Sequence, residues 1–232
     1  MKNHNIKKDL YLDSDKKCFI LGTGPSISDT PLHLLENHVT IGVNLILNSG
    51  FIPNYICVSD RDMINDNYDM IISDKMNNGG YLIAKPKHIN TLHKLNNLNN
   101  VRMIDGFKEK GNGLDGVLSD RKPFIDEKLE KFAMTKNGVI NDLAVSFAIY
   151  LGFKEIYLLG VDGQHGANTH FYDQKASKDK IDSIVREEAS DVTYKLLLPI
   201  LKKNNIKVYN CSVNKNKHPE LQYKDLLEIL GG

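Results

Sequence analysis

The stretch CFILGTGPS at residues 18–26 decides how this sequence is expected to fold. Its apolar run Phe19–Leu21 predicts a short buried strand, and the glycine-rich residues that follow predict that the strand ends abruptly in a turn. Residues 30–35 then predict the start of a helix, with Thr30 as its N-cap and Pro31 at its first position. Strand, glycine turn and helix in this order are typical of an α/β fold.

A glycine turn between a strand and a helix allows backbone N–H groups to approach an anion without interference from Cβ atoms. The sequence therefore predicts a nucleotide or another phosphate-bearing ligand at this turn, although such turns are also ordinary connections. The residues expected to contact the ligand are Gly22, Thr23, Gly24 and Ser26.

The turn differs from the known dinucleotide and triphosphate motifs. Ile27 stands where the GxGxxG fingerprint has its third glycine, and Asn44 follows the predicted second strand where a carboxylate would hold a ribose. Asn44 can still donate a hydrogen bond to a ribose or a base. No GxxxxGK[ST] segment occurs, so the sequence favours a nucleotide other than NAD and argues against a P-loop NTPase.

Composition indicates a soluble chain of one large domain. The 232 residues carry 30 basic and 29 acidic side chains, which gives no footprint for nucleic-acid binding. We expect a polar extension over residues 1–16 and a single Rossmann-like domain over residues 17–232. No apolar leader or membrane-spanning run is evident, so a cytoplasmic protein, peripheral at most to the inner face of the membrane, is expected. Three widely spaced cysteines suit reduced core residues.

Apolar runs alternate with helical patterns along the chain, which predicts a mostly parallel twisted sheet with helices on both faces. The helix from Val139 repeats apolar residues at a helical period up to Leu151, and Gly152 is expected to terminate it. The predicted strands are 17–21, 39–43, 55–59, 81–84, 101–104, 155–160 and 206–210. The predicted helices are 31–37, 88–95, 121–132, 139–151, 181–203 (interrupted at Pro199) and 221–230.

Two irregular polar stretches, residues 106–120 and 163–180, are expected to be lid or ligand loops, with a surface insertion as the alternative. The segment 160–173, which overlaps the second stretch, contains two histidines, two carboxylates and a tyrosine. His170 or His165 beside Asp162 or Asp173 would make a general base with an orienting carboxylate. Two other interpretations stay open: each histidine has a structural role, or Asp162 only fixes the loop by accepting backbone N–H bonds.

Two further motifs follow predicted elements at the same sheet edge. Asp60 and Asp62 form a D-x-D pair, which suits Mg²⁺ or Mn²⁺ on a nucleotide diphosphate, but Asp62 can equally cap a helix from Met63. Asn137 and Gly138 precede the Val139 helix and are either an anion site or a simple cap. No GxSxG elbow and no zinc-spaced set of cysteines and histidines occurs in the sequence.

Several of these segments resemble a known group of enzymes. ILGTGPSI at residues 20–27, GVNLIL at residues 42–47 and the stretch 137–162 are similar to bacterial CMP-sialic-acid-dependent sialyltransferases of the Campylobacter type. The same signatures occur in the MptE-like family, which includes 6-hydroxymethylpterin diphosphokinases and transferases of surface-glycan loci. The resemblance covers roughly residues 17–62 and 134–173, and more loosely the segment around 208–212.

The resemblance implies a cytidine nucleotide at the glycine turn and Asn44, with its phosphate near Asn137 and Gly138 and its base bordered by residues 210–212. The chain departs from the sialyltransferases at several positions. Thr23 replaces an asparagine, and Gln164 and His170 replace two tyrosines. The region 189–197 holds no histidine, where those enzymes have their base, and Met134 falls near their arginine.

Three functions follow from these patterns. The first is a transferase that uses a CMP- or CDP-linked sugar as donor and a glycan or lipid-linked acceptor in surface-glycan synthesis. The second is a pterin-type diphosphokinase with ATP and Mg²⁺ held by Asp60 and Asp62. The third is a non-catalytic nucleotide-binding module. No tightly bound cofactor is implied, and a homo-oligomer is left open.

Overall fold

The computed structural model describes residues 17–58, 63, 67, 69, 81–84, 101–102, 139–162, 171, 198–199, 201–213 and 218–231. Within these residues one sheet of eight strands forms the centre of the molecule, in the spatial order β5-β4-β3-β2-β1-β6-β7-β8. The strands are β1 (Lys17–Leu21), β2 (Val39–Val43), β3 (Tyr55–Val58), β4 (Tyr81–Ala84), β5 (Val101–Arg102), β6 (Glu155–Leu159), β7 (Lys207–Asn210) and β8 (Gln222–Tyr223).

All seven strand pairs are parallel, which confirms the predicted Rossmann-like α/β class. The first five strands step outward from β1 in one direction, and β6 then returns to the other side of β1. The order of the strands therefore reverses between β1 and β6. In open α/β sheets this reversal is where ligands bind, outside the carboxyl ends of the strands.

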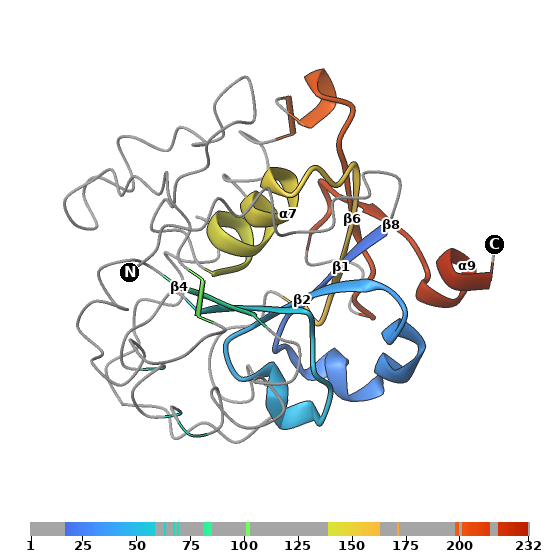
Figure 1. The fold of residues 1–232 in the computed structure, drawn as a ribbon. Helices are drawn as coiled ribbons and strands as arrows, with labels where there is room; N and C mark the ends of the chain where they lie inside the picture. The colour runs from blue at the N-terminus through green and yellow to red at the C-terminus, as the bar shows by residue number, and fades with distance from the viewer. Residues whose placement is uncertain are drawn as a thin grey trace, which may run out of the picture.

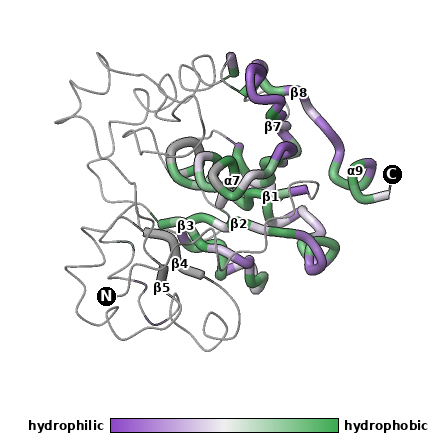
Figure 2. The backbone as a smooth tube through the Cα atoms, turned by 45° about the horizontal axis from the view of Figure 1, so that its top comes forward, coloured by the Kyte–Doolittle hydropathy of each residue, from purple (hydrophilic) through white to green (hydrophobic). Residues whose placement is uncertain are grey.

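Each face of the sheet carries its own apolar core. Cys18 and Ile20 of β1 join one core with the helix before β6, whereas Phe19 and Leu21 join the other with the short helices that follow β1 and β2. Successive strand residues point to opposite faces, so one apolar run supplies both cores. Figure 1 shows the two sets of helices on opposite sides of β1 and β2, and Figure 2 shows hydrophobic residues concentrated on the inner strands and on α7.

The helix before β6 occupies the predicted place but has two parts. Its first part is the π-helix η5 (Val139–Val145), and its second is the α-helix α7 (Ser146–Tyr150). Gly152 follows with φ +97°, and the N–H groups of Gly152 and Phe153 donate to the carbonyls of Ile149 and Ala148. This pair of bonds is a Schellman motif, as the glycine predicted.

The predicted boundaries are wrong for two helices, the one at residues 31–37 and the one at residues 221–230. Between β1 and β2 the chain forms two 3-10 helices, η1 (Pro25–Asp29) and η2 (Leu32–Leu35). Thr30 is no N-cap: it is the C-cap of η1, and its hydroxyl donates to the Ser26 carbonyl at 2.9 Å instead of capping η2.

The last helix, α9 (Leu226–Gly231), starts five residues later than expected, because residues 222–223 pair with β7 as β8. Asp225 fixes the observed start: its Oδ1 accepts the N–H of Leu227 at 2.8 Å. β8 has only two residues, too few to show a strand pattern in the sequence, and was not predicted.

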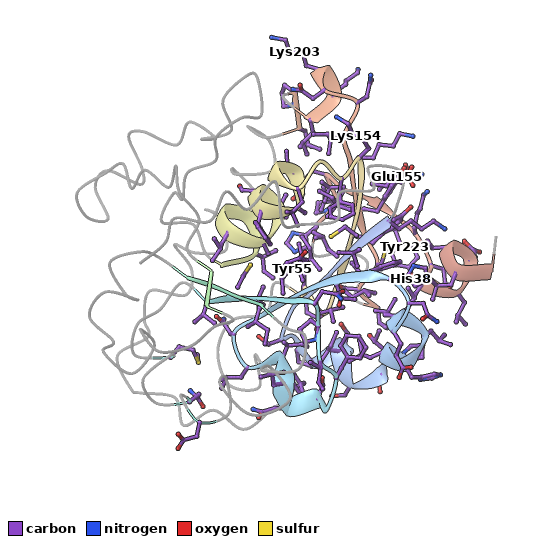
Figure 3. All side chains as sticks on the ribbon, in the orientation of Figure 1. His38, Tyr55, Lys154, Glu155, Lys203 and Tyr223 are labelled. Atoms are coloured by element: carbon purple, nitrogen blue, oxygen red, sulfur yellow. The ribbon has the colours of Figure 1, made fainter. Side chains whose placement is uncertain are left out.

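The amino ends of the parallel strands β1, β2 and β6 share one edge of the sheet. Lys154 and Glu155 mark the start of β6 at this edge, and Figure 3 labels both side chains. There Glu155 accepts the Tyr157 hydroxyl at 2.7 Å. Tyr157 in turn stacks between Phe19 and Tyr209, with ring centroids 5.2 Å apart on each side. These stacked rings link β1, β6 and β7 on one face.

The predicted helices 88–95 and 121–132, the extension 1–16 and the loop 106–120 lie outside the described residues. So does 163–180 except Phe171, and so does most of 181–203, of which residues 198–199 and 201–203 are helical. The single-domain organisation therefore stays a prediction. Among the described residues, no helix has the length and apolar character needed to cross a bilayer.

Candidate functional site at the β1–β6 switch point

The carboxyl ends of β1 and β6 are joined directly by their backbones. The N–H of Gly22 donates to the Leu159 carbonyl at 2.7 Å, and the N–H of Gly24 donates to the Gly160 carbonyl at 2.8 Å. These bonds continue the pairing of the two strands beyond their last sheet residues. The glycine turn and the loop after β6 are therefore one packed unit at the switch point.

The same close packing explains why glycines stand in this turn. A Cβ atom on Gly22 would collide with the Gly160 carbonyl oxygen, and one on Gly24 would lie 2.7 Å from that oxygen and collide with the Asp162 carboxylate. Gly160 itself has φ +64°, a left-handed conformation that favours glycine. The close contact between the two loops therefore explains these glycines without any contact to a ligand.

Asp162 and Ser26 form a buried side-chain pair across the switch point. The Oδ1 of Asp162 accepts the Ser26 hydroxyl at 2.5 Å, and its Oδ2 accepts the Ser26 N–H at 2.8 Å. Asp162 is 3 % exposed and Ser26 9 % exposed. Of the alternatives open from the sequence, the structure shows Asp162 accepting a backbone N–H.

These hydrogen bonds limit which backbone groups of the glycine turn could bind a ligand. The N–H groups of Gly22, Gly24 and Ser26 all donate to protein oxygens, so the expectation that they face an anion is wrong for these three donors. An anion cradle requires N–H groups that point outward. Ligand contact by the turn itself stays a prediction, and it would have to involve other atoms.

Asn44 occupies the carboxyl end of β2, next to β1. It is half-buried, has φ +48°, and donates its N–H to the Cys57 carbonyl of β3 at 3.0 Å. A left-handed conformation is uncommon outside glycine, and asparagine tolerates it better than most residues. Such conformations gather at ligand sites, where the fold holds them in place.

Asn210 lies in the segment that only the resemblance, and no sequence pattern, placed near the expected ligand. It ends β7 fully buried, and its Oδ1 accepts the Ser212 N–H at 3.0 Å. The Ser212 hydroxyl accepts the Val161 N–H at 2.9 Å, which ties β7 to the loop after β6. Among the described residues, the Asn210 Nδ2 has no hydrogen-bond partner. A buried amide donor without a partner is rare and calls for an acceptor.

The loop after β6 returns to the glycine turn. Phe171 donates its N–H to the Thr23 carbonyl at 3.0 Å and packs against the core formed by Phe19 and Leu21. Asp162 and Phe171 therefore contact neighbouring residues of the same turn. This return was not predicted, because the sequence between the two residues is polar and shows neither a helical nor a strand period.

The helix before β6 begins near the same sheet edge. After α7, residues 151–154 connect directly to β6, so the carboxyl end of the helix lies at the amino edge of the sheet. The helix runs back from this edge across the sheet, and its first part, η5, contacts β1, β2 and β3. The Val139 end therefore lies toward the carboxyl edge.

Other predicted site residues cannot be placed. The remaining candidates lie outside the described residues: His165, His170, Asp173, Asp60, Asp62, Asn137 and Gly138. Within the described part of the chain, no three histidine, cysteine or acidic side chains form a group suited to a metal ion. The three cysteines are free and buried, as expected. Burial raises the pKa of the Cys211 thiol to about 12 and also raises the pKa of Cys18 and Cys57, so none is a ready nucleophile.

Fold and switch point together define a Rossmann-like α/β protein with a candidate ligand site at the carboxyl edge of its sheet. Residues 1–166 match the family described as "6-hydroxymethylpterin diphosphokinase MptE-like", and the chain belongs to this MptE-like family. No curated protein is similar enough in sequence to count as a relative.

Solved structures share the fold at low sequence identity. The sialyltransferase CstII from Campylobacter jejuni, in complex with a substrate analogue, cytidine-5'-monophosphate, has a TM-score of 0.52 and 15 % identity, and the match covers 91 % of this chain and 86 % of that one. A complex of CST-II with a trisaccharide acceptor and CMP has a TM-score of 0.51 and 17 % identity, and the match covers 90 % of this chain and 86 % of that one. The monofunctional α-2,3-sialyltransferase Cst-I from Campylobacter jejuni has a TM-score of 0.54 and 13 % identity, and the match covers 93 % of this chain and 83 % of that one. These similarities confirm the suspected relation in fold.

Proposed function

We propose that the chain is a transferase that uses a nucleotide-activated donor, a CMP- or CDP-linked sugar, in bacterial surface-glycan biosynthesis. The observation that carries the proposal is the switch point between β1 and β6, where Asn44, Asn210 and the glycine turn stand at the carboxyl ends of neighbouring strands. Ligands of open α/β sheets bind at this position. The CMP complexes of proteins with the same fold support a cytidine nucleotide as the ligand.

The nucleotide would contact polar groups on both sides of the switch point. Asn44 is suited to a ribose hydroxyl, since its amide offers both a donor and an acceptor. The free Nδ2 donor of Asn210 complements an acceptor such as the carbonyl oxygen of a pyrimidine base. Because the turn's own N–H groups are occupied, the phosphates would lie toward the start of the Val139 helix, with Asn137, Gly138 and Asp60 nearby in this proposal.

His170, or in its place His165, would act as the base that takes the proton of the acceptor hydroxyl. The N–H of Phe171, the residue after His170 in the sequence, donates to the Thr23 carbonyl of the glycine turn at 3.0 Å. Both oxygens of Asp162 accept from Ser26, so Asp173 is the better candidate for orienting the base. The acceptor would be a glycan or a lipid-linked glycan at the cytoplasmic face of the membrane.

Thermal unfolding with CMP, CDP, UDP, GDP and ATP, each with and without Mg²⁺, tests the proposal. We expect CMP or CDP to stabilise the protein without metal, by about 2.7 kcal/mol at a concentration of 100 times Kd. Asn44→Ala should weaken this stabilisation. Asn205→Ala is the matched control, because Asn205 is also left-handed, with φ +55°, but stands before β7 at the amino edge. No stabilisation by any cytidine nucleotide would refute the proposal.

A diphosphokinase is the second candidate, and the description of the matching family favours it. It would move pyrophosphate from ATP, with Mg²⁺ held by Asp60 and Asp62. Stabilisation by ATP only when Mg²⁺ is present would select this function over the first. Binding of a nucleotide without turnover of any donor would instead indicate a non-catalytic module.

A further inference from the structure

We propose that Ser26 and Asp162 are a positioning pair, which sets the spacing and orientation of the β1 and β6 loops on which nucleotide binding depends. This inference rests on the proposed function, since it concerns the same site. It differs from a catalytic role for Asp162, because no atom of the pair is assigned a contact with the reacting groups.

The geometry fixes orientation as well as distance. One residue, Ser26, supplies two donors, and one carboxylate accepts them on separate oxygens at 2.5 and 2.8 Å. A single bond would allow the two loops to rotate about it, whereas two bonds between the same partners oppose rotation. The pair joins residues 136 positions apart in the sequence.

Two further hydrogen bonds connect the pair to its neighbours along the chain. The Ser26 carbonyl accepts the Thr30 hydroxyl at 2.9 Å, which links the pair to the end of η1. Three residues before Ser26, the Thr23 carbonyl accepts the Phe171 N–H at 3.0 Å. A shift of Asp162 would therefore move the glycine turn and the point where residue 171 attaches to it.

The acceptor in this pair is a buried carboxylate, and a neutral acceptor would be enough if the pair only tethered the two loops. Removing a carboxylate from water costs several kcal/mol, and Asp162 is 3 % exposed. A neutral pair would tether two loops at a smaller cost. A carboxylate is an acceptor at both oxygens, and its hydrogen bonds are shorter and stronger than neutral ones. It thus holds one geometry more firmly than an amide or a hydroxyl would.

Both Asp162 oxygens already accept a hydrogen bond from Ser26, and the side chain is 3 % exposed, so little of the carboxylate is accessible to a substrate proton. Protonation would also weaken these bonds, because a neutral acid accepts hydrogen bonds less strongly than a carboxylate does. Gly24 adds to the constraint, since a side chain there would collide with the carboxylate. Substitution of Asp162 should therefore act through the shape of the site.

The experiment compares Ser26→Ala, Asp162→Asn and Ser26→Thr in the full chain. Isothermal titration with CMP at 15 °C gives Kd, and amide hydrogen exchange is followed at Gly24 and Phe171. We expect Ser26→Ala and Asp162→Asn to weaken CMP binding about ten- to hundredfold and to speed both amide exchanges. Ser26→Thr, which keeps the hydroxyl, should restore affinity to within about threefold.

Thr40→Val is the matched control. Thr40 is equally buried, and its hydroxyl donates to the Asn54 side chain at 3.0 Å, but it pairs with the middle of β1. Its loss should lower thermal stability and leave both Kd and the two exchange rates unchanged. This comparison separates positioning from a general loss of stability.

Unchanged Kd and unchanged exchange in both Ser26→Ala and Asp162→Asn would overturn the positioning pair. Wild-type protein that binds no CMP would refute the proposed ligand instead, and the exchange rates at Gly24 and Phe171 would then decide the structural part alone. The two failures are thus distinguishable.

Discussion

At the carboxyl end of β1, the Asp162 carboxylate determines what its neighbours can be. Gly24 has no room for a side chain because the carboxylate occupies that space, and Ser26 must supply a hydroxyl to it. The sequence pattern identified these residues as a group but assigned the glycines to ligand contact. Their neighbour is a residue more than a hundred positions away, so the actual cause could be found only from the folded chain.

His170→Ala is the residue-scale prediction for the proposed chemistry. Loss of a general base should lower kcat by about 10²- to 10⁴-fold, because the acceptor proton has no other positioned base. The Kd for the donor should stay within about twofold of the wild-type value, which is about 0.4 kcal/mol. Release of CMP from the sugar donor measures turnover, and titration measures Kd.

His33→Ala serves as its control, since His33 is exposed on η2 and is not part of the proposed site. Equal turnover in His170→Ala and the wild type would refute the base assignment.

At the scale of elements, strands were easier to predict than helices. The strands β1 and β2 have the predicted boundaries, because buried parallel strands are continuous apolar runs closed by glycine or asparagine. The connections after β1 and β2 consist of 3-10 helices, which are too short to show a helical period. The helix that begins with η5 was predicted from its apolar period, but this period did not distinguish a π-helix from an α-helix.

Gly152→Ala tests the termination of the helix before β6. The residue has φ +97°, and a Cβ atom there would meet no atom within 4 Å, so the cost should come from the backbone alone. We expect a loss of about 1–2 kcal/mol in the free energy of unfolding, measured with urea. Gly231→Ala is the control, because its Cβ would also meet no neighbour and its φ is not in the left-handed range. A loss of equal size at both positions would contradict the Schellman assignment.

At the scale of the whole molecule, the switch point follows from the order of the strands. Alternating apolar and helical segments predicted the parallel sheet and the carboxyl edge as the site. They did not predict that β6 returns beside β1, because strand order depends on packing between distant segments. Once this order is known, the central position of β1 between two cores is a direct consequence.

Ile20→Ala and Leu21→Ala test whether the two cores unfold together. These adjacent residues of β1 are fully buried in opposite cores, so each truncation should cost about 2–5 kcal/mol. Because one sheet separates the cores, circular dichroism and tyrosine fluorescence should report one coincident transition in urea. A two-step transition in either variant, or probes that disagree, would show that the faces unfold separately.

The pairing of β6 with β7 shows that the sheet continues beyond the region matched by the family. The region shared with the family ends at residue 166, after β6 but before β7. β6 bonds to β7 through four matched residues, from Glu155 with Lys207 to Leu158 with Asn210. A fragment ending there would expose β6 as a bare apolar edge, the kind of surface on which chains aggregate. The family signature thus marks shared ancestry, and it does not delimit an autonomous folding unit.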